Sequence, residues 1–249
     1  MILATDRLNV EMLQPPARIN NAMPSRLFAI GDIHGCATAL KTLIVAIDPQ
    51  PEDTIVVLGD MIDCGPDSKG VLDQLIALSS RCHVVALLGN HEEMLLNALE
   101  SRSEFKYWLK LGGEQTLRSY SSAIRPGLEV IPAEHIRFIQ GCRPYFETER
   151  HIFVHASYDP ELPMDRQSER SLRWESVLPE RMAPHVSGKV VIAGHTRQKS
   201  GEILDQGFFQ ILDTDAFGNG WLTALEVHTG EVIQTDQQGQ RRRPENAPV

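Results

Sequence analysis

The sequence contains little cysteine and no long apolar run. Its four cysteines form no Cys-x-x-Cys pair and lack the density of a disulfide scaffold, so we expect reduced thiols and a cytoplasmic location. No apolar run approaches the roughly 20 residues that a membrane-spanning helix needs. Residues 1–24 also lack the basic start and the long apolar stretch of a secretion signal. These absences argue against a membrane protein and against a secreted one.

Positive charge is also scarce. Lys and Arg together number 24 against 33 for Asp and Glu, which gives a net charge of −9. Because nonspecific nucleic-acid binding depends on clustered Lys and Arg, this balance argues against a nucleic-acid polymer as a partner. An anionic substrate would need a local positive charge, and bound divalent cations are the obvious source. The apolar share of 42% is ample for the core of one compact domain.

Three segments share a pattern in which a short apolar run ends in glycine and then in metal-ligand side chains. They are Ala29-Ile30-Gly31-Asp32-Ile33-His34-Gly35, Leu58-Gly59-Asp60-Met61-Ile62-Asp63-Cys64-Gly65 and Leu87-Leu88-Gly89-Asn90-His91-Glu92. Aspartate, asparagine and histidine together suit divalent cations, with oxygen ligands favouring manganese or iron and imidazole tolerating zinc. Asp60 is the carboxylate placed to be shared between two cations, as a two-metal site requires. A single Gly-Asp pair is usually only a turn, so the prediction depends on the three segments together.

The elements around these segments alternate between strand and helix. We predict strands at 26–30, 54–58 and 84–88, and helices at 37–47, after the turn at 65–68, and at about 92–100. This order implies parallel strands joined by crossovers, and in such sheets ligands collect at the carboxyl ends of the strands. The three segments should therefore meet at one edge of a sheet.

Two histidines further along the chain also follow predicted strands. A hairpin at 145–148 and 151–154 ends before His155, and a strand at 190–193 ends before His195. Further strands are predicted at 208–212, 221–227 and 231–235. His155 and His195 are thus candidates to complete the metal site, and an ordinary core or surface histidine is the alternative for each.

We divide the chain into three parts. Residues 1–25 are interpreted as a flexible N-terminal extension, 26–235 as one domain and 236–249 as a disordered polar tail. Within the domain, residues 101–187 form a helical and irregular region that we expect on the substrate side. Its apolar stripe is interpreted as core and consists of Phe105, Trp108, Leu109 and Leu111.

Together the three segments resemble the phosphoprotein phosphatase branch of the calcineurin-like metallophosphoesterases, and the resemblance extends over about residues 26–235. Bacterial serine/threonine phosphatases and symmetrical diadenosine tetraphosphate hydrolases look most similar. The resemblance implies the α/β metallophosphoesterase fold, with two packed mixed β-sheets flanked by helices. It also implies two divalent metal ions, Mn²⁺ first with iron or zinc as alternatives, and direct attack by a metal-bound hydroxide without a covalent intermediate.

The resemblance also assigns roles to single residues. The metal ligands would be Asp32 and His34 for the first ion, Asn90, His155 and His195 for the second, and Asp60 for both. His91 would be the general acid, because a histidine held by a carboxylate can have a pKa near working pH, and Asp63 would orient it. A turn-capping role is the alternative for Asp63, and Glu92 is expected to support the loop.

Two positions depart from the family pattern. Cys64 stands where the family usually has an arginine that grips substrate phosphate, and Ser176 stands where many bacterial members have another. Arg173 and Arg197 are the candidates to replace the missing charge, and ordinary surface roles are the alternative. Losing one charge-assisted hydrogen bond of about 1.5–3 kcal/mol would weaken transition-state binding roughly ten- to a hundredfold. Cys64 itself is interpreted as a small filler, with a redox-sensitive thiol as the alternative.

The first prediction for function is a serine/threonine-type phosphoprotein phosphatase acting on phosphorylated proteins. The runner-up is a symmetrical dinucleoside polyphosphate hydrolase, which acts on a small phosphate anhydride. The alternative from another class is a catalytically weakened, metal-binding regulatory module, motivated by Cys64 and Ser176. A cyclic-nucleotide or nucleic-acid phosphodiesterase is a further alternative, which the acidic balance disfavours for polymers.

Overall fold

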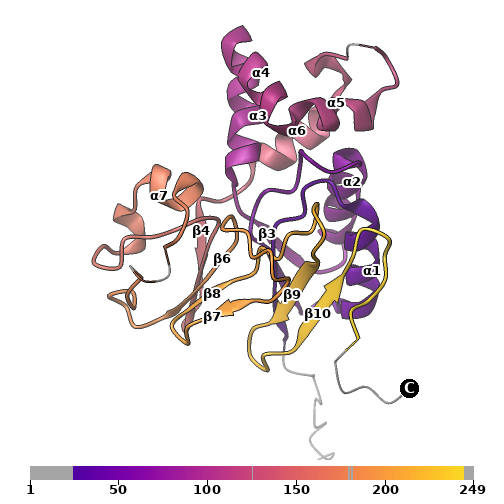
Figure 1. Cartoon of the computed structure of the whole chain (residues 1–249). Helices are drawn as coiled ribbons and strands as arrows, with labels where there is room; N and C mark the ends of the chain where they lie inside the picture. The colour runs from indigo at the N-terminus through magenta and orange to yellow at the C-terminus, as the bar shows by residue number, and fades with distance from the viewer. Residues whose placement is uncertain (1–24, 125, 179, 181, 244–249) are drawn as a thin grey trace, which may run out of the picture.

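The residues that the structure describes form two five-stranded sheets that pack face to face (Figure 1). This computed structural model describes residues 25–124, 126–178, 180 and 182–243, so the predicted extension lies outside the described residues except for Ser25. The first sheet has the order β10-β9-β1-β2-β3, with β1 (Leu27–Ile30), β2 (Thr54–Val57), β3 (His83–Ala86), β9 (Leu222–Glu226) and β10 (Val232–Thr235). The second has the order β4-β5-β6-β8-β7, with β4 (Tyr145–Glu147), β5 (His151–Val154), β6 (Val190–Ala193), β7 (Leu204–Asp205) and β8 (Phe209–Ile211). Each sheet mixes parallel and antiparallel neighbours.

The strands of the first sheet are apolar on both faces because both faces are covered. In β1, Leu27 and Ala29 pack in the core between the sheets, whereas Phe28 and Ile30 pack in the core beneath the helices. This alternation is the two-residue period of a strand. The second sheet contributes Phe153 and other apolar side chains to the core between the sheets.

Helices α1 (Ala37–Ile47) and α2 (Ser68–Leu78) connect β1, β2 and β3 and cover the outer face of the first sheet (Figure 1). At helical spacing, α1 turns Leu40, Leu43 and Ile47 into the core. Because β1, β2 and β3 run parallel, their carboxyl ends lie at the same edge of the sheet. The predicted alternation of strands and helices is therefore confirmed.

A second group of helices stands above that carboxyl edge (Figure 1). It contains α3 (Asn90–Glu100), α4 (Arg102–Trp108), the π-helical turn η1 (Leu109–Gly113), α5 (Glu114–Tyr120), the 3₁₀ turn η2 (Leu128–Val130) and α6 (Ala133–Gln140). The chain kinks within η1, where Gly112 has a φ of 120° that other residues rarely adopt. The predicted apolar stripe is confirmed only in part, because Trp108 is 0% exposed whereas Leu111, at the kink, is 40% exposed.

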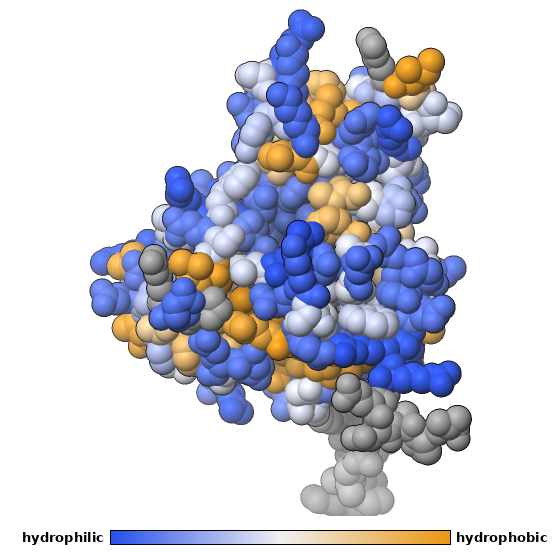
Figure 2. Space-filling model, in the orientation of Figure 1, coloured by the Kyte–Doolittle hydropathy of each residue, from blue (hydrophilic) through white to orange (hydrophobic). Residues whose placement is uncertain are grey.

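The outer face of the second sheet packs against the segment between β5 and β6. That segment contains the 3₁₀ turn η3 (Met164–Arg166) and helix α7 (Glu169–Trp174), and it buries Tyr158 and Leu172 against Phe209. Figure 2 shows mostly hydrophilic residues on the face of the molecule that it displays. No helix in the described ranges combines the length and the apolar character needed to cross a membrane.

The end of the chain differs from the predicted disordered tail over residues 236–243. Here the backbone turns back toward β10 and makes an isolated antiparallel bridge with it. The Arg242 guanidinium donates to Gly201 O at 3.1 Å and lies over the Trp221 ring, 5.7 Å from its centroid. These long-range contacts hold a polar segment that composition alone marks as disordered.

Candidate metal centre

The six predicted metal ligands gather where the carboxyl edges of the two sheets meet. The first sheet supplies Asp32 and His34 after β1, Asp60 after β2, and Asn90 at the start of α3. The second sheet supplies His155 after β5 and His195 after β6. Five of the six are buried and His195 is half-buried. The structure thus brings together all of the side chains that the strand-end pattern singled out.

Close contacts explain why glycine precedes two of these ligands. A Cβ atom at Gly89 would lie 2.2 Å from Asp60 Oδ1, and one at Gly194 would lie 2.1 Å from Asp32 Oδ1. Any larger residue would therefore collide with a ligand carboxylate. His195 N also donates to both carboxylate oxygens of Asp32 at 3.1 Å, which joins the loops of the two sheets.

Asp60 belongs to two clusters of ligand atoms. Asp32, His34 and Asp60 form one cluster and Asp60, His155 and His195 form the other, and within each the ligand atoms lie within 4.8 Å of one another. Asp60 Oδ2 is 3.5 Å from His34 Nε2, and Asp60 Oδ1 is 3.4 Å from His155 Nε2. One carboxylate with an oxygen toward each cluster is the arrangement that two neighbouring cations need.

The three imidazoles turn their lone pairs toward these clusters. Each ring has its outer nitrogen on a backbone carbonyl: His34 Nδ1 is 3.1 Å from Ile62 O, His155 Nδ1 is 2.8 Å from Leu58 O, and His195 Nε2 is 3.2 Å from Trp174 O. A carbonyl oxygen can only accept, so each of these nitrogens carries the ring proton. The other nitrogen of each ring is then an unprotonated acceptor, which is the form that binds metals.

The position of Asn90 indicates that a cation fits between these acceptors. Its Oδ1 lies 3.0 Å from His155 Nε2 and 3.1 Å from His195 Nδ1, so an amide oxygen faces two imidazole lone pairs. Three acceptors without a donor between them repel one another, whereas a divalent cation would bind all three. This donor set of oxygen and imidazole nitrogen therefore fits divalent metal ions.

Burial sets the charge state of the histidine ligands. It lowers the pKa of His34 and of His155 to about 4, and it also lowers the pKa of His195. Burial raises the pKa of Asp60, but His155, His91 and the other imidazoles outweigh burial and hold that pKa below its ordinary value. At neutral pH the centre thus combines neutral imidazoles with an ionised Asp60, as metal binding requires.

Asp213 is a buried carboxylate near Asp32 that the sequence analysis missed. It comes shortly after β8 and is 3% exposed. Burial raises the pKa of Asp213 to about 7, and burial together with Asp213 raises the pKa of Asp32 well above its ordinary value. The strand-end rule could have found Asp213, because the predicted strand at 208–212 ends directly before it. Neighbouring carboxylates strengthen the need for positive charge in the centre.

His91 and Asp63 form a hydrogen-bonded pair beside the ligands. His91 Nδ1 is 2.8 Å from Asp63 Oδ2, and His91 Nε2 lies 3.9 Å from Asp60 Oδ2. Asp63 is 0% exposed and also accepts from Trp108 Nε1 at 2.8 Å and from Thr116 Oγ1 at 2.6 Å, two partners that were not predicted. Burial lowers the pKa of His91, but Asp60 and Asp63 outweigh burial and raise that pKa to about 9.

Glu92 supports the Asp60 loop, which confirms the prediction for this residue. Its Oε2 accepts from Asp60 N and its Oε1 accepts from Met61 N, both at 2.8 Å. The same loop holds Asp60, Asp63 and Cys64 in left-handed conformations, with φ values of 46°, 71° and 64°. Such conformations persist only where the surroundings hold them, and the Glu92 hydrogen bonds are part of that support.

The two arginine candidates for substrate binding differ in their surroundings. Arg173 is buried, and its Nε lies 3.1 Å from Glu93 Oε2, so a carboxylate already neutralises much of its charge. The Arg197 side chain is 37% exposed, and its Nη1 lies 3.2 Å from Asp215 Oδ1. Ser176 is exposed and carries no charge. Arg197 is therefore the more accessible of the two candidates.

The Cys64 thiol is held in its protonated form. Burial, followed by Asp63 and Asp60, raises the pKa of this thiol to about 12. Because the thiolate is the reactive form of cysteine, this environment disfavours the redox-sensitive alternative. Cys64 is half-buried, in keeping with a small side chain at the rim of the centre.

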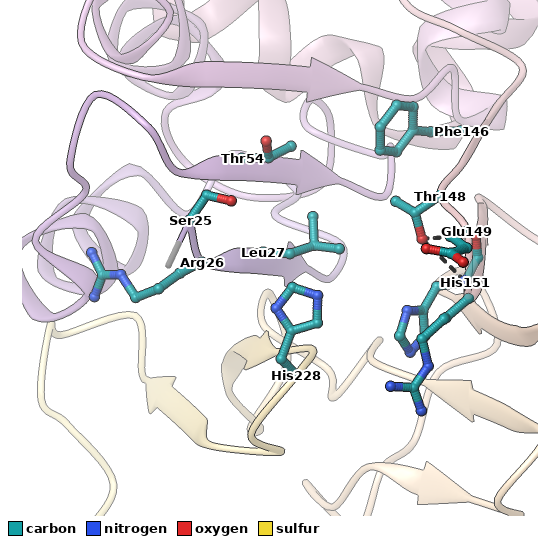
Figure 3. Close-up of a pocket in the computed structure, with 10 residues that line it drawn as sticks. Ser25, Arg26, Leu27, Thr54, Phe146, Thr148, Glu149, His151 and His228 are labelled. Atoms are coloured by element: carbon teal, nitrogen blue, oxygen red, sulfur yellow. Dashed lines mark hydrogen bonds between the residues drawn. The ribbon is translucent and has the colours of Figure 1, made fainter. Parts of the chain in front are cut away.

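A separate cavity of about 270 Å³ lies at the amino ends of the strands (Figure 3). Its lining includes Arg26, Thr54 and His151, which lie at the starts of β1, β2 and β5. None of the three-residue clusters of metal-ligating side chains found in the described part of the chain includes a residue of this lining. The metal-ligating chemistry is therefore concentrated at the opposite, carboxyl edge.

Comparison with known proteins agrees with this arrangement. Residues 25–199 match the calcineurin-like phosphoesterase family. The chain is 36% identical over 135 residues to serine/threonine-protein phosphatase 1 of Salmonella typhimurium, covering 53% of this chain and 59% of that protein. It is 44% identical over 73 residues to the symmetrical bis(5'-nucleosyl)-tetraphosphatase of an Acidovorax strain, covering 29% of this chain and 25% of that protein. The matched segments thus span less than two thirds of the length of either relative.

Two solved structures share the fold. A cold-active protein-tyrosine phosphatase of a Shewanella species has a TM-score of 0.63 at 18% identity, covering 88% of this chain and 80% of that one. A protein serine/threonine phosphatase from Saccharomyces cerevisiae has a TM-score of 0.58 at 15% identity, covering 92% of this chain and 83% of that one. At these identities the likeness concerns the fold alone, and it confirms the predicted α/β arrangement of two mixed sheets flanked by helices. With a family match over residues 25–199, which include all six predicted metal ligands, the chain belongs to the calcineurin-like phosphoesterase family.

Proposed function

We propose that the protein is a metal-dependent phosphoesterase that acts as a serine/threonine-type phosphoprotein phosphatase. The observation that carries the proposal is the position of Asp60, whose two oxygens face two separate ligand clusters. The family match and the 36% identity to a serine/threonine-protein phosphatase also support it. A symmetrical dinucleoside polyphosphate hydrolase is the second candidate, because a relative of that name is 44% identical over its matched segment.

Two divalent cations fit the centre. The residues that would hold them are Asp32 and His34 for one ion, Asn90, His155 and His195 for the other, and Asp60 for both. When bound, the two ions would polarise the phosphoryl oxygens and activate a water molecule as the nucleophile. The mixture of oxygen and imidazole donors favours Mn²⁺, with iron and zinc as alternatives.

His91 is the proposed general acid. Asp63 accepts a hydrogen bond from His91 Nδ1–H, so the Nε2 proton of the charged ring points toward the reaction centre. The pKa of about 9 keeps the ring protonated at neutral pH. In this position the ring can protonate the leaving oxygen of a phosphate ester. Asp63 continues to hold Nδ1–H after the transfer, which leaves the neutral ring in a single tautomer.

Arg197 is the proposed contact for substrate phosphate, in place of the arginine that Cys64 replaces. Its guanidinium lies over the Phe217 ring, 5.1 Å from the centroid, which limits its orientations. One nitrogen pairs with Asp215, and the other donors of the five on a guanidinium are available to a phosphate. Arg197 also follows the ligand His195 by two residues in the chain.

A side-by-side assay would separate the two candidate activities. The Mn²⁺-loaded protein would be tested on a phosphoserine peptide, on diadenosine tetraphosphate and on nitrophenyl phosphate, with Asp60→Asn as the matched control. A phosphoprotein phosphatase releases phosphate from the peptide faster than it cleaves diadenosine tetraphosphate, and the runner-up shows the reverse order. If the protein hydrolyses none of the three faster than Asp60→Asn, the enzyme proposal fails.

The catalytically weakened regulatory module has less support than an enzyme. The grouping of the six predicted ligands and the His91–Asp63 hydrogen bond support an enzyme, whereas the change at Cys64 concerns a proposed substrate contact. Cys64→Arg tests this alternative. A large gain from a near-zero baseline supports the module, and robust activity before the substitution excludes it.

The proposed setting is the cytoplasm. All four cysteines lie in the described part of the chain and are unpaired, which suits a reducing compartment. The net charge of −9 favours phosphorylated proteins or small phosphate compounds over nucleic-acid polymers as substrates.

A further inference from the structure

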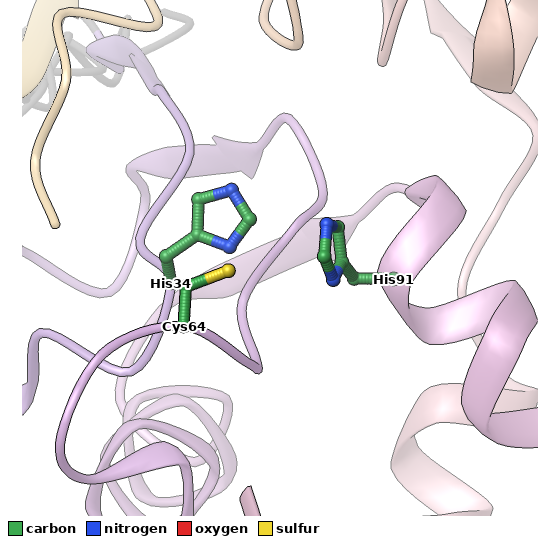
Figure 4. A group of neighbouring side chains, drawn as sticks. All are labelled: His34, Cys64 and His91. Carbon is green, nitrogen blue, oxygen red and sulfur yellow. The ribbon is translucent and has the colours of Figure 1, made fainter. Parts of the chain in front are cut away.

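Cys64, His34 and His91 form a third cluster of metal-ligating side chains in the centre. The Cys64 sulfur and one ring nitrogen from each histidine lie within 4.8 Å of one another. Figure 4 shows the thiol directed toward the gap between the two imidazoles, which meet edge to face with centroids 4.8 Å apart. Cys64 is half-buried, so a cation can reach the sulfur from solvent.

In both histidines the Nδ1 atom is already hydrogen-bonded, so Nε2 is the ring nitrogen that can bind a cation. His34 Nδ1 lies 3.1 Å from a backbone carbonyl, and His91 Nδ1 lies 2.8 Å from Asp63 Oδ2. The Nε2 atom of each ring is therefore the one that can donate a lone pair to a cation, once His91 has lost its Nε2 proton. A carbonyl or carboxylate on the outer nitrogen is the usual support of a metal-binding histidine, because it fixes the tautomer and the ring orientation.

The donor set of this third cluster differs from the other two because it contains sulfur. A thiolate with two imidazoles selects thiophilic cations such as Zn²⁺ and Cd²⁺, whereas carboxylate-rich sites suit Mn²⁺. Three protein donors leave a fourth position of a tetrahedral site for water. We propose that His34, Cys64 and His91 form an inhibitory site for a thiophilic divalent cation.

Occupation of this site would block catalysis by taking His91 away from acid catalysis and His34 away from the first cluster. This consequence rests on the proposed function. The Cys64 S–H bond breaks, the sulfur binds the cation and the proton passes to the buffer. The charged His91 ring also loses its Nε2 proton to the buffer and donates the freed lone pair to the cation, so His91 no longer carries a proton for the leaving oxygen. His34 Nε2 also serves the cluster with Asp32 and Asp60, and it cannot bind two cations at once.

Cadmium titration of the metal-depleted full-length protein tests the site without any activity assay. Absorbance from sulfur-to-cadmium charge transfer reports the thiolate bond. Cys64→Ser removes the sulfur, and His91→Gln keeps the sulfur but removes a ligand. Cys142→Ser is the matched control, because Cys142 is also half-buried but lies outside the cluster. Circular dichroism checks that each variant is folded, and His34→Gln replaces His91→Gln, with the same expectation, if that variant is not.

The expected result has three parts. Wild type and Cys142→Ser show the same band, Cys64→Ser lacks it, and His91→Gln binds Cd²⁺ at the sulfur at least about tenfold more weakly. A band that persists in Cys64→Ser, or an unchanged affinity in His91→Gln, overturns the proposal.

Inhibition by zinc provides the link to activity. Zn²⁺ should inhibit the Mn²⁺-loaded wild type at concentrations at least about tenfold lower than those that inhibit Cys64→Ser. Equal inhibition of both proteins would show that zinc acts elsewhere. If the protein hydrolyses no phosphate compound, the cadmium titration still decides whether the site exists, so the two proposals can fail separately.

Discussion

Asp63 Oδ2 lies 2.8 Å from His91 Nδ1, so a carboxylate that is 0% exposed fixes the orientation of the proposed acid. The same carboxylate accepts from Trp108 and Thr116, which holds it in one position. Because the His91 Nδ1 proton is engaged, Nε2 is the ring atom that can act on a substrate. We therefore propose Asp63 as a positioning residue for His91.

His91→Asn should slow the hydrolysis of phosphate esters with a poor leaving group far more than the hydrolysis of nitrophenyl phosphate. An alkoxide needs a proton as it leaves, and loss of a general acid reduces the rate by roughly 10²–10⁴-fold. Nitrophenolate is stable without that proton. The measurement is kcat/KM for a phosphoserine peptide and for nitrophenyl phosphate in both proteins. An equal loss on the two substrates would contradict the role of His91 as an acid.

Trp108→Phe should keep a smaller aromatic ring in the core and remove one donor to Asp63. We expect the free energy of unfolding to fall by about 1 kcal/mol, and kcat to fall with little change in KM, because the His91–Asp63 pair is less firmly held. Urea unfolding and steady-state kinetics measure the two effects. Trp221→Phe is the control for the loss of an indole elsewhere, since the half-buried Trp221 ring packs under the Arg242 guanidinium. An unchanged kcat in Trp108→Phe would mean that this hydrogen bond serves folding alone.

The grouping of the six predicted metal ligands could be anticipated from the sequence because each one closely follows an apolar strand. Parallel strands place their carboxyl ends at one edge, so local patterns are enough to bring Asp32, Asp60 and Asn90 together. Trp108 and Thr116 were not predictable, because the helices that carry them are placed by the kink at η1 and by tertiary packing. From the sequence alone, Trp108 resembles an ordinary core residue.

The fold shows the same division between local and long-range information. The strands and helices from 26 to 100 have clear periods, and the structure has them close to the predicted bounds. Strand β7 has only two residues, too few to show any period, and it was missed. Residues 236–243 are held by contacts such as that of Arg242 with Gly201, which depend on groups distant in the sequence.

Asp60→Asn should reduce both metal content and activity while the fold is retained. Asparagine has the same shape but carries no charge, and its amide nitrogen cannot bind a cation, so one of the two clusters loses a ligand. We expect metal content to fall below about two ions per chain. We expect kcat to fall by more than about a hundredfold, the upper end of what changes around metal ligands cause. Elemental analysis measures the metal content and circular dichroism checks the fold. Full metal content together with full activity would show that Asp60 is not a metal ligand.

Arg197→Ala should lower kcat/KM roughly ten- to a hundredfold, the equivalent of one charge-assisted hydrogen bond to phosphate. Metal content should not change, because Arg197 is not one of the proposed metal ligands. The matched control is Arg170→Ala, since the Arg170 side chain is 83% exposed and pairs with Glu175. If both variants behave like wild type, the substrate phosphate is bound without Arg197.

Asp53 joins the starts of β1 and β2 and offers a test of stability outside the metal centre. Its side chain is 3% exposed, and it accepts from Arg26 N at 3.0 Å, from Arg26 Nη2 at 2.5 Å and from Gln50 N at 2.8 Å. Burial raises the pKa of Asp53, but the Arg26 and Gln50 hydrogen bonds outweigh burial and hold the pKa below its ordinary value.

Asp53→Asn should therefore lower the free energy of unfolding at pH 7 by about 1.5–3 kcal/mol, the contribution of hydrogen bonds to a charged group. Because the pKa of Asp53 is lower in the folded state, its ionised carboxylate stabilises the fold. That contribution is complete at pH values above the unfolded-state pKa of about 3.9. That contribution is lost as the pH falls through the folded-state pKa, so the difference between the two proteins should be smaller at pH 3. Urea unfolding of the metal-depleted proteins at pH 7 and pH 3 measures it. An equal difference at both pH values would mean that the shape of the side chain, and not its charge, stabilises this corner of the sheet.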